Sequence, residues 1–282
     1  MKLAQKLGLA YYRANLQLLS LVSPKKAAKK AFKLFSTPFT RSSNVPAPIF
    51  DEGELLSFTI DNNLISGYRW NHPAKRKVLI VHGFESSSVN FHQYITRLVK
   101  ADFEVLAFDA PAHGRSGGKR ILLPEYVNMI HAVIRKFGPV DNYIAHSLGG
   151  LALMHALETV PDAEISKVTL IAPATETTSA VDRFFRMFNL NVAVREHFDE
   201  LVIKKGGASP SHYSIRRAIK QTKAAIMWIH DDTDRITPLA DALKVKEDQH
   251  EHLRFVTTTG LGHRRIYKDE QVIRQVLDFL HS

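Results

Sequence analysis

The chain has 282 residues, of which 45% are apolar, so it is long enough to bury the core of one large α/β domain or of two small ones. It contains no cysteine, which excludes a disulfide framework, a thiolate metal site and thiol chemistry. The formal net charge of +10 is uneven: residues 1–46 carry nine Lys and Arg side chains and no acidic one, whereas the remainder holds 29 basic and 28 acidic side chains.

The first expected element is an amphipathic helix in this basic N-terminal arm. The apolar run of residues 1–23 is interrupted by Arg13, Asn15 and Gln17. The interrupted run makes a poor signal peptide and is too short to span a bilayer. We therefore expect a cytoplasmic protein. Helical spacing places six apolar side chains near one stripe: Leu3, Leu7, Ala10, Ala14, Leu18 and Leu21.

A second basic helix is expected over residues 24–35, because Ser23 suits its N-cap and Pro24 its first position. Five lysines oppose its apolar face, which consists of Ala28, Ala31, Phe32 and Phe35. Residues 1–45 could therefore contact an anionic membrane peripherally; alternatively, the apolar face covers the main body and the lysines are solvated, which we favour. No nucleic-acid partner is expected, because the arm lacks a recognition motif and the body has no charge excess.

The prolines of PAPIF (46–50) predict a linker, which divides the chain into an arm and linker over residues 1–48 and a main domain over 49–282. The main domain begins with two short apolar runs, LLSFTI and LISGYRW, around the turn residues 61–63. This pattern predicts a β-hairpin.

Beyond the hairpin, apolar runs typical of buried strands alternate with stretches of helical period. The expected strands are residues 77–83, 103–109, 143–147, 167–173, 225–231 and 253–258, and the expected helices are 91–100, 124–137, 148–160 and 269–280. Such alternation predicts a mainly parallel twisted sheet with helices on both faces.

About fifty residues separate the sixth strand from the next, which is too long for a simple connection. The segments AVDRFFRMFNL and VREHFDELVIKK have helical period, so we expect a small helical cap over about 174–222. Four cap phenylalanines could line an acyl pocket, although packing on the main domain is the favoured role for most of them: Phe184, Phe185, Phe188 and Phe198.

The stretch YIAHSLGG (143–150) places Ser147 directly after an expected strand and before an expected helix. Ala145 and Gly149 flank the serine at two residues on either side, and small residues there allow the sharp turn that exposes a nucleophilic Oγ. A helix N-terminus also favours developing negative charge. Ser147 is therefore the candidate nucleophile.

An acid and a histidine should follow in loops at the carboxyl ends of later strands. After residues 225–231 comes DDTDRITP, in which Asp231, Asp232 or Asp234 could be the acid. After residues 253–258 comes GLGH, which ends in His263. The order serine, acid, histidine is therefore met.

With these motifs, residues 50–282 resemble the α/β-hydrolase superfamily. HGFESS (82–87) is similar to its His-Gly-X turn after the third strand, and DAPAHGRSGG (109–118) to its loop after the next strand. The resemblance implies that Asp234, four residues before a proline, is the acid. It also implies an oxyanion hole formed by the backbone N–H groups of Phe84 and Leu148.

The expected function is that of a serine hydrolase, esterase- or lysophospholipase-like, which cleaves a small-molecule acyl ester through Ser147, His263, Asp234 and an acyl-enzyme. Thioester hydrolysis, carbon–carbon bond hydrolysis and acyl transfer would use the same residues. A non-catalytic interaction protein, with its basic arm on a membrane or partner, is the alternative from another class. We expect no cofactor and no metal, because His113 and Asp109 alone fall short of a metal site.

Overall fold

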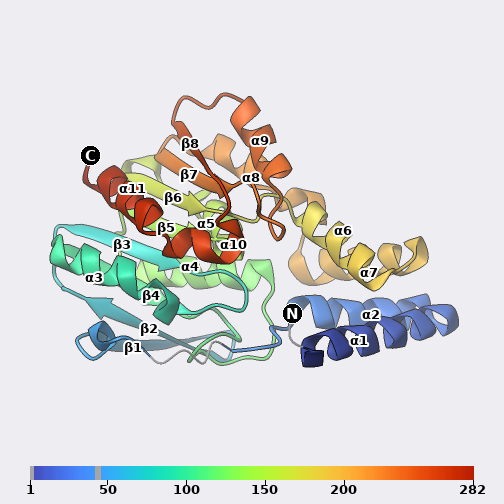
Figure 1. The fold of residues 1–282 in the computed structure, drawn as a ribbon. Helices are drawn as coiled ribbons and strands as arrows, with labels where there is room; N and C mark the ends of the chain where they lie inside the picture. Colours follow the sequence, from blue (N-terminus) through green and yellow to red (C-terminus); the bar gives the residue numbers. More distant parts are fainter. Residues whose placement is uncertain (1–2, 42–45) are drawn as a thin grey trace. The chain divides into compact units, whose positions relative to one another are not determined.

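A computed structural model describes residues 3–41 and 46–282 and shows one eight-stranded sheet, in the order β1-β2-β4-β3-β5-β6-β7-β8 (Figure 1). The strands are β1 (Glu54–Ile60), β2 (Asn63–Trp70), β3 (Arg76–Val81), β4 (Phe103–Phe108), β5 (Asn142–His146), β6 (Lys167–Ile171), β7 (Ala225–Asp231) and β8 (Leu253–Thr258). β2 pairs antiparallel with β1 and with β4, and every other pair is parallel. The predicted hairpin and mainly parallel sheet are confirmed.

The longer helices of the described chain include all four that the sequence predicts in the main domain. Their bounds are α1 (Leu3–Val22), α2 (Pro24–Ser36), α3 (His92–Lys100), α4 (Leu123–Phe137), α5 (Leu148–Leu157), α6 (Thr177–Phe188), α7 (Val192–Gly206), α9 (Leu239–Glu247) and α11 (Glu270–His281), with short α8 (Ile215–Ala218) and α10 (Gly262–Arg265). The sequence analysis missed α9, whose short, mixed polar sequence lacks a clear apolar stripe. No helix within the described residues is both long and apolar enough to cross a membrane.

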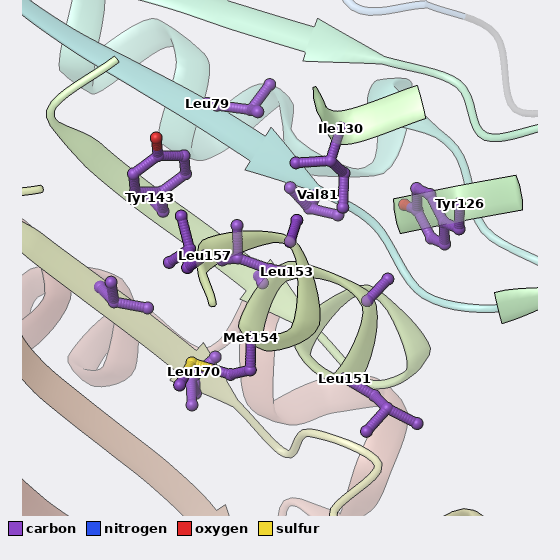
Figure 2. Close-up of a cluster of buried hydrophobic side chains, with 14 of the residues drawn as sticks. Leu79, Val81, Tyr126, Ile130, Tyr143, Leu151, Leu153, Met154, Leu157 and Leu170 are labelled. Atoms are coloured by element: carbon purple, nitrogen blue, oxygen red, sulfur yellow. The ribbon is translucent and has the colours of Figure 1, made fainter. Parts of the chain in front are cut away.

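Two apolar layers cover the sheet because successive strand residues point to opposite faces. On β3, Leu79 and Val81 pack toward α4 and α5, whereas Val78 and Ile80 pack toward α3 and α11. Figure 2 shows part of the first layer, in which Leu153 and Leu157 of α5 lie close to side chains of β3 and β5. The predicted helices on both faces are therefore confirmed.

The chain divides into two compact units. The larger one comprises residues 38–175 and 214–282 and contains the whole sheet. The smaller one comprises residues 1–37 and 176–213, so it joins the arm helices α1 and α2 to the cap helices α6 and α7. The predicted boundaries lie at residues 48, 174 and 222, whereas the two units meet after residues 37, 175 and 213. Of the predicted arm and linker, residues 1–2 and 42–45 lie outside the described residues.

The smaller unit has a core of phenylalanine rings contributed by both of its sequence segments. Ser23 caps α2 as predicted, by accepting a hydrogen bond from the N–H of Lys26. On the apolar face of α2, Phe32 contacts Phe198 at a ring-centroid distance of 5.7 Å, and Phe35 contacts Phe184 at 5.4 Å. The sequence predicts packing of these arm and cap side chains on the main domain, but the structure packs them on each other. Each amphipathic pair of helices buries the other's apolar face.

The PAPIF segment is not a simple linker. Its residues Pro48–Phe50 form a short 3-10 turn in which Ile49 and Phe50 are buried. Phe50 packs edge to face on Tyr68 and Trp70, and the indole N–H of Trp70 donates a 2.7 Å hydrogen bond to the carbonyl of Ile49. The prolines prevent a strand, as the sequence indicates. The two apolar residues that follow them, Ile49 and Phe50, anchor the segment to β2.

The layer shown in Figure 2 yields a stability prediction. Replacing the fully buried Leu153 by Ala removes apolar contacts and leaves a cavity, so it should lower the free energy of unfolding by about 2–5 kcal/mol. The matched change Leu55→Ala, at a site that is 53% exposed, should alter it by no more than about 0.5 kcal/mol. Urea unfolding measures both values, and equal losses for the two variants would contradict the assignment of the core.

Candidate active site

Ser147 occupies a strained turn between β5 and α5, with φ 55° and ψ −126°. A positive φ is uncommon for a residue other than glycine and costs about 1–3 kcal/mol, so the surroundings must hold the turn in place. They do so through hydrogen bonds on both sides: the N–H of Ser147 donates to the carbonyl of Ile171, and the N–H of Ala174 donates to the carbonyl of Ser147. The end of β6 and the loop that follows it therefore fix the turn.

Two glycines let the loop after β3 approach this turn closely. A Cβ on Gly149 would lie 2.4 Å from the carbonyl oxygen of His82, and a Cβ on Gly83 would lie 2.8 Å from the Cβ of Ser147. Phe84 directly follows Gly83, and Leu148 is the first residue of α5, where backbone N–H groups have no acceptor within the helix. The two predicted oxyanion donors thus belong to segments that meet at Ser147.

His263 links the serine to an aspartate in one hydrogen-bonded chain. Its Nε2 lies 2.9 Å from the Oγ of Ser147, and its Nδ1 lies 2.7 Å from the Oδ2 of Asp234. All three side chains are buried. The structure therefore brings together the three residues that the sequence separates by 116 and 29 positions.

Asp234 is held as a carboxylate. Burial alone would raise its pKa, but the hydrogen bond and charge interaction with His263, together with N–H donors of Ile236 and Thr237, lower the pKa of Asp234 to about 2. An ionised carboxylate only accepts hydrogen bonds, so Nδ1 of His263 carries the proton that faces Asp234. Nε2 is then left to accept a proton from Ser147.

Thr237 is a site residue that the sequence analysis missed. Its Oγ1 donates to Oδ2 of Asp234 at 2.8 Å and lies 3.1 Å from Nδ1 of His263. The signal was present in the spacing, because an aspartate often accepts from residues two and three positions later. Thr237 therefore fixes the orientation of the Asp234 carboxylate.

The other two candidate aspartates lie outside the chain of three. Asp231, at the end of β7, is fully buried and accepts hydrogen bonds from the N–H groups of Leu261 and Gly262, at 3.0 and 2.8 Å. It also accepts from side-chain hydroxyls of Thr233 and Thr258. Burial alone would raise the pKa of Asp231, but these hydrogen-bond donors hold that pKa below its ordinary value. Asp231 thus anchors the loop that ends in His263.

Asp232 differs from its neighbour because its side chain is exposed. Its carboxylate accepts a 2.9 Å hydrogen bond from the hydroxyl of Thr259. This contact lies at the surface, where such a bond contributes little to stability. Asp232 is therefore a suitable control for substitutions of Asp231 and Asp234.

Neutral histidines support the loop that carries Phe84. His113 accepts a hydrogen bond from the N–H of Glu85 at its Nε2 and donates from Nδ1 to the carbonyl of Pro111. Burial, assisted by the nearby His82, lowers the pKa of His113 to about 4. His82 itself accepts at Nε2 from the N–H of Ala110. Both rings thus serve as fixed hydrogen-bond partners in the loops.

His146, directly before the nucleophile, packs on the catalytic candidate His263. The ring centroids lie 4.7 Å apart, and Nε2 of His146 lies 3.0 Å from the backbone carbonyl oxygen of His263. Burial lowers the pKa of His146 well below its ordinary value, so this ring is neutral. In the described part of the chain, no three His, Asp or Glu side chains are placed to hold a metal ion.

The anchoring role of Asp231 yields a prediction about pH and stability. Because its pKa is lower in the folded state, its stabilising effect is complete above its unfolded pKa of about 3.9 and is lost as the pH falls below that value. Asp231→Asn should therefore reduce the free energy of unfolding by about 1–3 kcal/mol at pH 7, and by less at pH 3.5. Urea unfolding at both pH values, with Asp232→Asn as control, measures this; a deficit that grows toward low pH would contradict it.

Comparisons with known proteins agree with this architecture. The model of the serine aminopeptidase S33 family matches residues 72–234. The uncharacterized hydrolase YugF of Bacillus subtilis is 28% identical over 121 residues, which are 40% of this chain and 42% of that protein, so the match spans less than half of that relative. A monoacylglycerol lipase of Mycolicibacterium smegmatis is 23% identical over 244 residues, 73% of this chain and 86% of that protein.

Among solved structures, an esterase of Pyrococcus furiosus superposes with a TM-score of 0.62 at 20% identity, over 87% of this chain and 97% of that one. This likeness concerns the fold. The family match extends over more than half of the chain and includes Ser147 and Asp234. The chain belongs to the serine aminopeptidase S33 family of the α/β-hydrolase superfamily.

Proposed function

We propose that the protein is a serine hydrolase that cleaves carboxylic esters through an acyl-enzyme. The observation that carries the proposal is the buried hydrogen-bonded chain from Ser147 through His263 to Asp234. The three side chains lie in the order and hydrogen-bonded arrangement that nucleophilic acyl transfer needs. The strained turn at Ser147 adds to this, because such strain gathers at functional sites.

In the proposed reaction, the Oγ of Ser147 attacks the ester carbonyl carbon while Nε2 of His263 takes its proton. Asp234 stabilises the resulting imidazolium, and the N–H groups of Phe84 and Leu148 stabilise the tetrahedral oxyanion. The carbon–oxygen bond to the alcohol then breaks, and His263 protonates the leaving alcohol. Water, deprotonated by His263, hydrolyses the acyl-enzyme to a carboxylic acid and restores Ser147.

The choice of an ester as substrate rests on the names of the similar proteins. One is a monoacylglycerol lipase and another is an esterase. The family description names an aminopeptidase, which would act on a peptide bond through the same three residues. Thioesters and carbon–carbon bonds are further substrates of the same chemistry. The decisive comparison is therefore between ester and amide substrates of matched leaving groups.

Ser147→Ala tests the nucleophile. Hydrolysis of p-nitrophenyl acetate, butyrate, octanoate and laurate by the full chain should fall by at least about 1,000-fold in kcat, because the variant lacks the Oγ that His263 contacts and that would form the acyl-enzyme. The exposed Ser57→Ala should retain wild-type kcat at every chain length. Wild type that hydrolyses aminoacyl p-nitroanilides faster than all four esters would overturn the ester proposal while leaving the nucleophile in place.

Asp234→Asn tests the orientation of the histidine. An amide at this position cannot hold the proton on Nδ1 of His263 or stabilise the imidazolium, so kcat should fall by about 1,000- to 10,000-fold. KM should change much less, because Asp234 contacts His263 and would act through that ring rather than on the substrate. Asp232→Asn is the matched control. A kcat within tenfold of wild type in the Asp234 variant would exclude this carboxylate from the mechanism.

A further inference from the structure

The outer side of α1 carries a stripe of large exposed apolar side chains. Leu7, Tyr11, Leu18, Leu21 and Val22 are 64%, 64%, 67%, 81% and 84% exposed. At 3.6 residues per turn, these five positions fall within an arc of roughly 100° around the helix axis. They therefore form one continuous stripe, of the width found on helices that bury one face.

This stripe is not the side that holds the smaller unit together. The opposite side of α1 carries Leu16, which is fully buried, and Ser20, which is 9% exposed. Beside the stripe, next to Val22 on the helical wheel, the side-chain oxygen of Asn15 accepts a hydrogen bond from the ammonium group of Lys30 on α2. The unit is thus packed on one side of α1, while the five apolar side chains of the stripe remain largely exposed to solvent, although the ring of Tyr11 contacts that of Tyr12 on the same helix.

The surroundings of the stripe are strongly positive. Residues 1–46 contain nine Lys and Arg side chains and no acidic one. On α2, Lys25, Lys26, Lys29 and Lys33 are exposed, while Ala27, Ala28 and Ala31 are buried. The arm therefore presents an apolar stripe on one helix and a row of cations on the helix beside it, a combination that fits an apolar surface bordered by negative charge.

We propose that α1 and α2 dock on the surface of an anionic lipid bilayer, with the five apolar side chains in the interfacial region and the lysines of α2 against acidic headgroups. A second copy of the chain is a poorer occupant, because pairing the two arms would bring nine cations against nine with no acidic residue in either arm to offset them. An anionic bilayer satisfies both the apolar stripe and the charge. The proposal does not depend on the reaction at Ser147.

Vesicle co-sedimentation of the full chain tests the proposal. Wild type should bind vesicles that contain phosphatidylglycerol and phosphatidylcholine in equal parts, and bind vesicles of phosphatidylcholine alone at least tenfold more weakly. High salt should weaken the binding to the anionic vesicles, because it screens the lysines.

Two multiple variants separate the contribution of the apolar stripe from that of the lysines. The first removes exposed apolar side chains of α1: Leu18→Gln, Leu21→Gln and Val22→Gln. The second removes four charges of α2: Lys25→Gln, Lys26→Gln, Lys29→Gln and Lys33→Gln. Each set should lower the partition coefficient at least tenfold. Because all these positions are exposed, circular dichroism and hydrolysis of a soluble ester should stay at wild-type values.

Matched controls lie in the larger unit. One control set, Leu55→Gln with Leu64→Gln, removes two exposed apolar side chains. The other replaces four exposed lysines and so removes the same charge as the α2 variant: Lys75→Gln, Lys100→Gln, Lys119→Gln and Lys220→Gln. Both control sets should bind as wild type does. Equal binding by wild type and the arm variants would overturn the proposal. So would a wild-type chain that does not bind vesicles and that light scattering shows to be a dimer, if the apolar variant is a monomer.

Discussion

The turn at Ser147 is the constraint on which the rest of the site depends. A φ of 55° is unfavourable for a non-glycine residue, so contacts with neighbouring segments must stabilise it. The carbonyl of Ile171 and the N–H of Ala174 bind the turn from β6, and the loop after β3 approaches so closely that only glycine fits at residues 83 and 149. The parallel pairing of β3, β5 and β6 brings these segments to one edge of the sheet.

The two buried aspartates after β7 divide two tasks. Asp234 faces His263 directly, and its lowered pKa keeps it ionised where it can orient the imidazole. Asp231 pairs in register with Thr258 of β8 and accepts from the two N–H groups that precede His263. One carboxylate thus orients the ring and the other holds the backbone that carries the ring.

Much of this arrangement could be predicted from local patterns. The apolar runs indicated the strands because a parallel sheet is buried on both faces, and loops at their carboxyl ends must lie at one edge. That placed Ser147, His263 and three aspartates near each other. Spacing alone did not separate Asp231 from Asp234, since both follow the same strand; the family resemblance selected Asp234, and the structure places it beside His263.

Long-range packing was the part that sequence patterns could not supply. A helix with an apolar face must bury it, but the pattern does not say against what. Phe32 and Phe35 therefore pointed to burial without indicating Phe184 and Phe198 as their partners. Likewise, PAPIF has the composition of a linker, and only the aromatic rings of β2 explain why Phe50 is buried.

The central claim is that Ser147 is an activated nucleophile. The most direct measurement is the intact mass of the full chain after treatment with a fluorophosphonate, which phosphonylates a serine only when a neighbouring base activates it. We predict a single adduct that peptide mapping locates on Ser147. A folded wild-type chain that gains no adduct, or an equal adduct on the Ser147→Ala variant, would contradict the account.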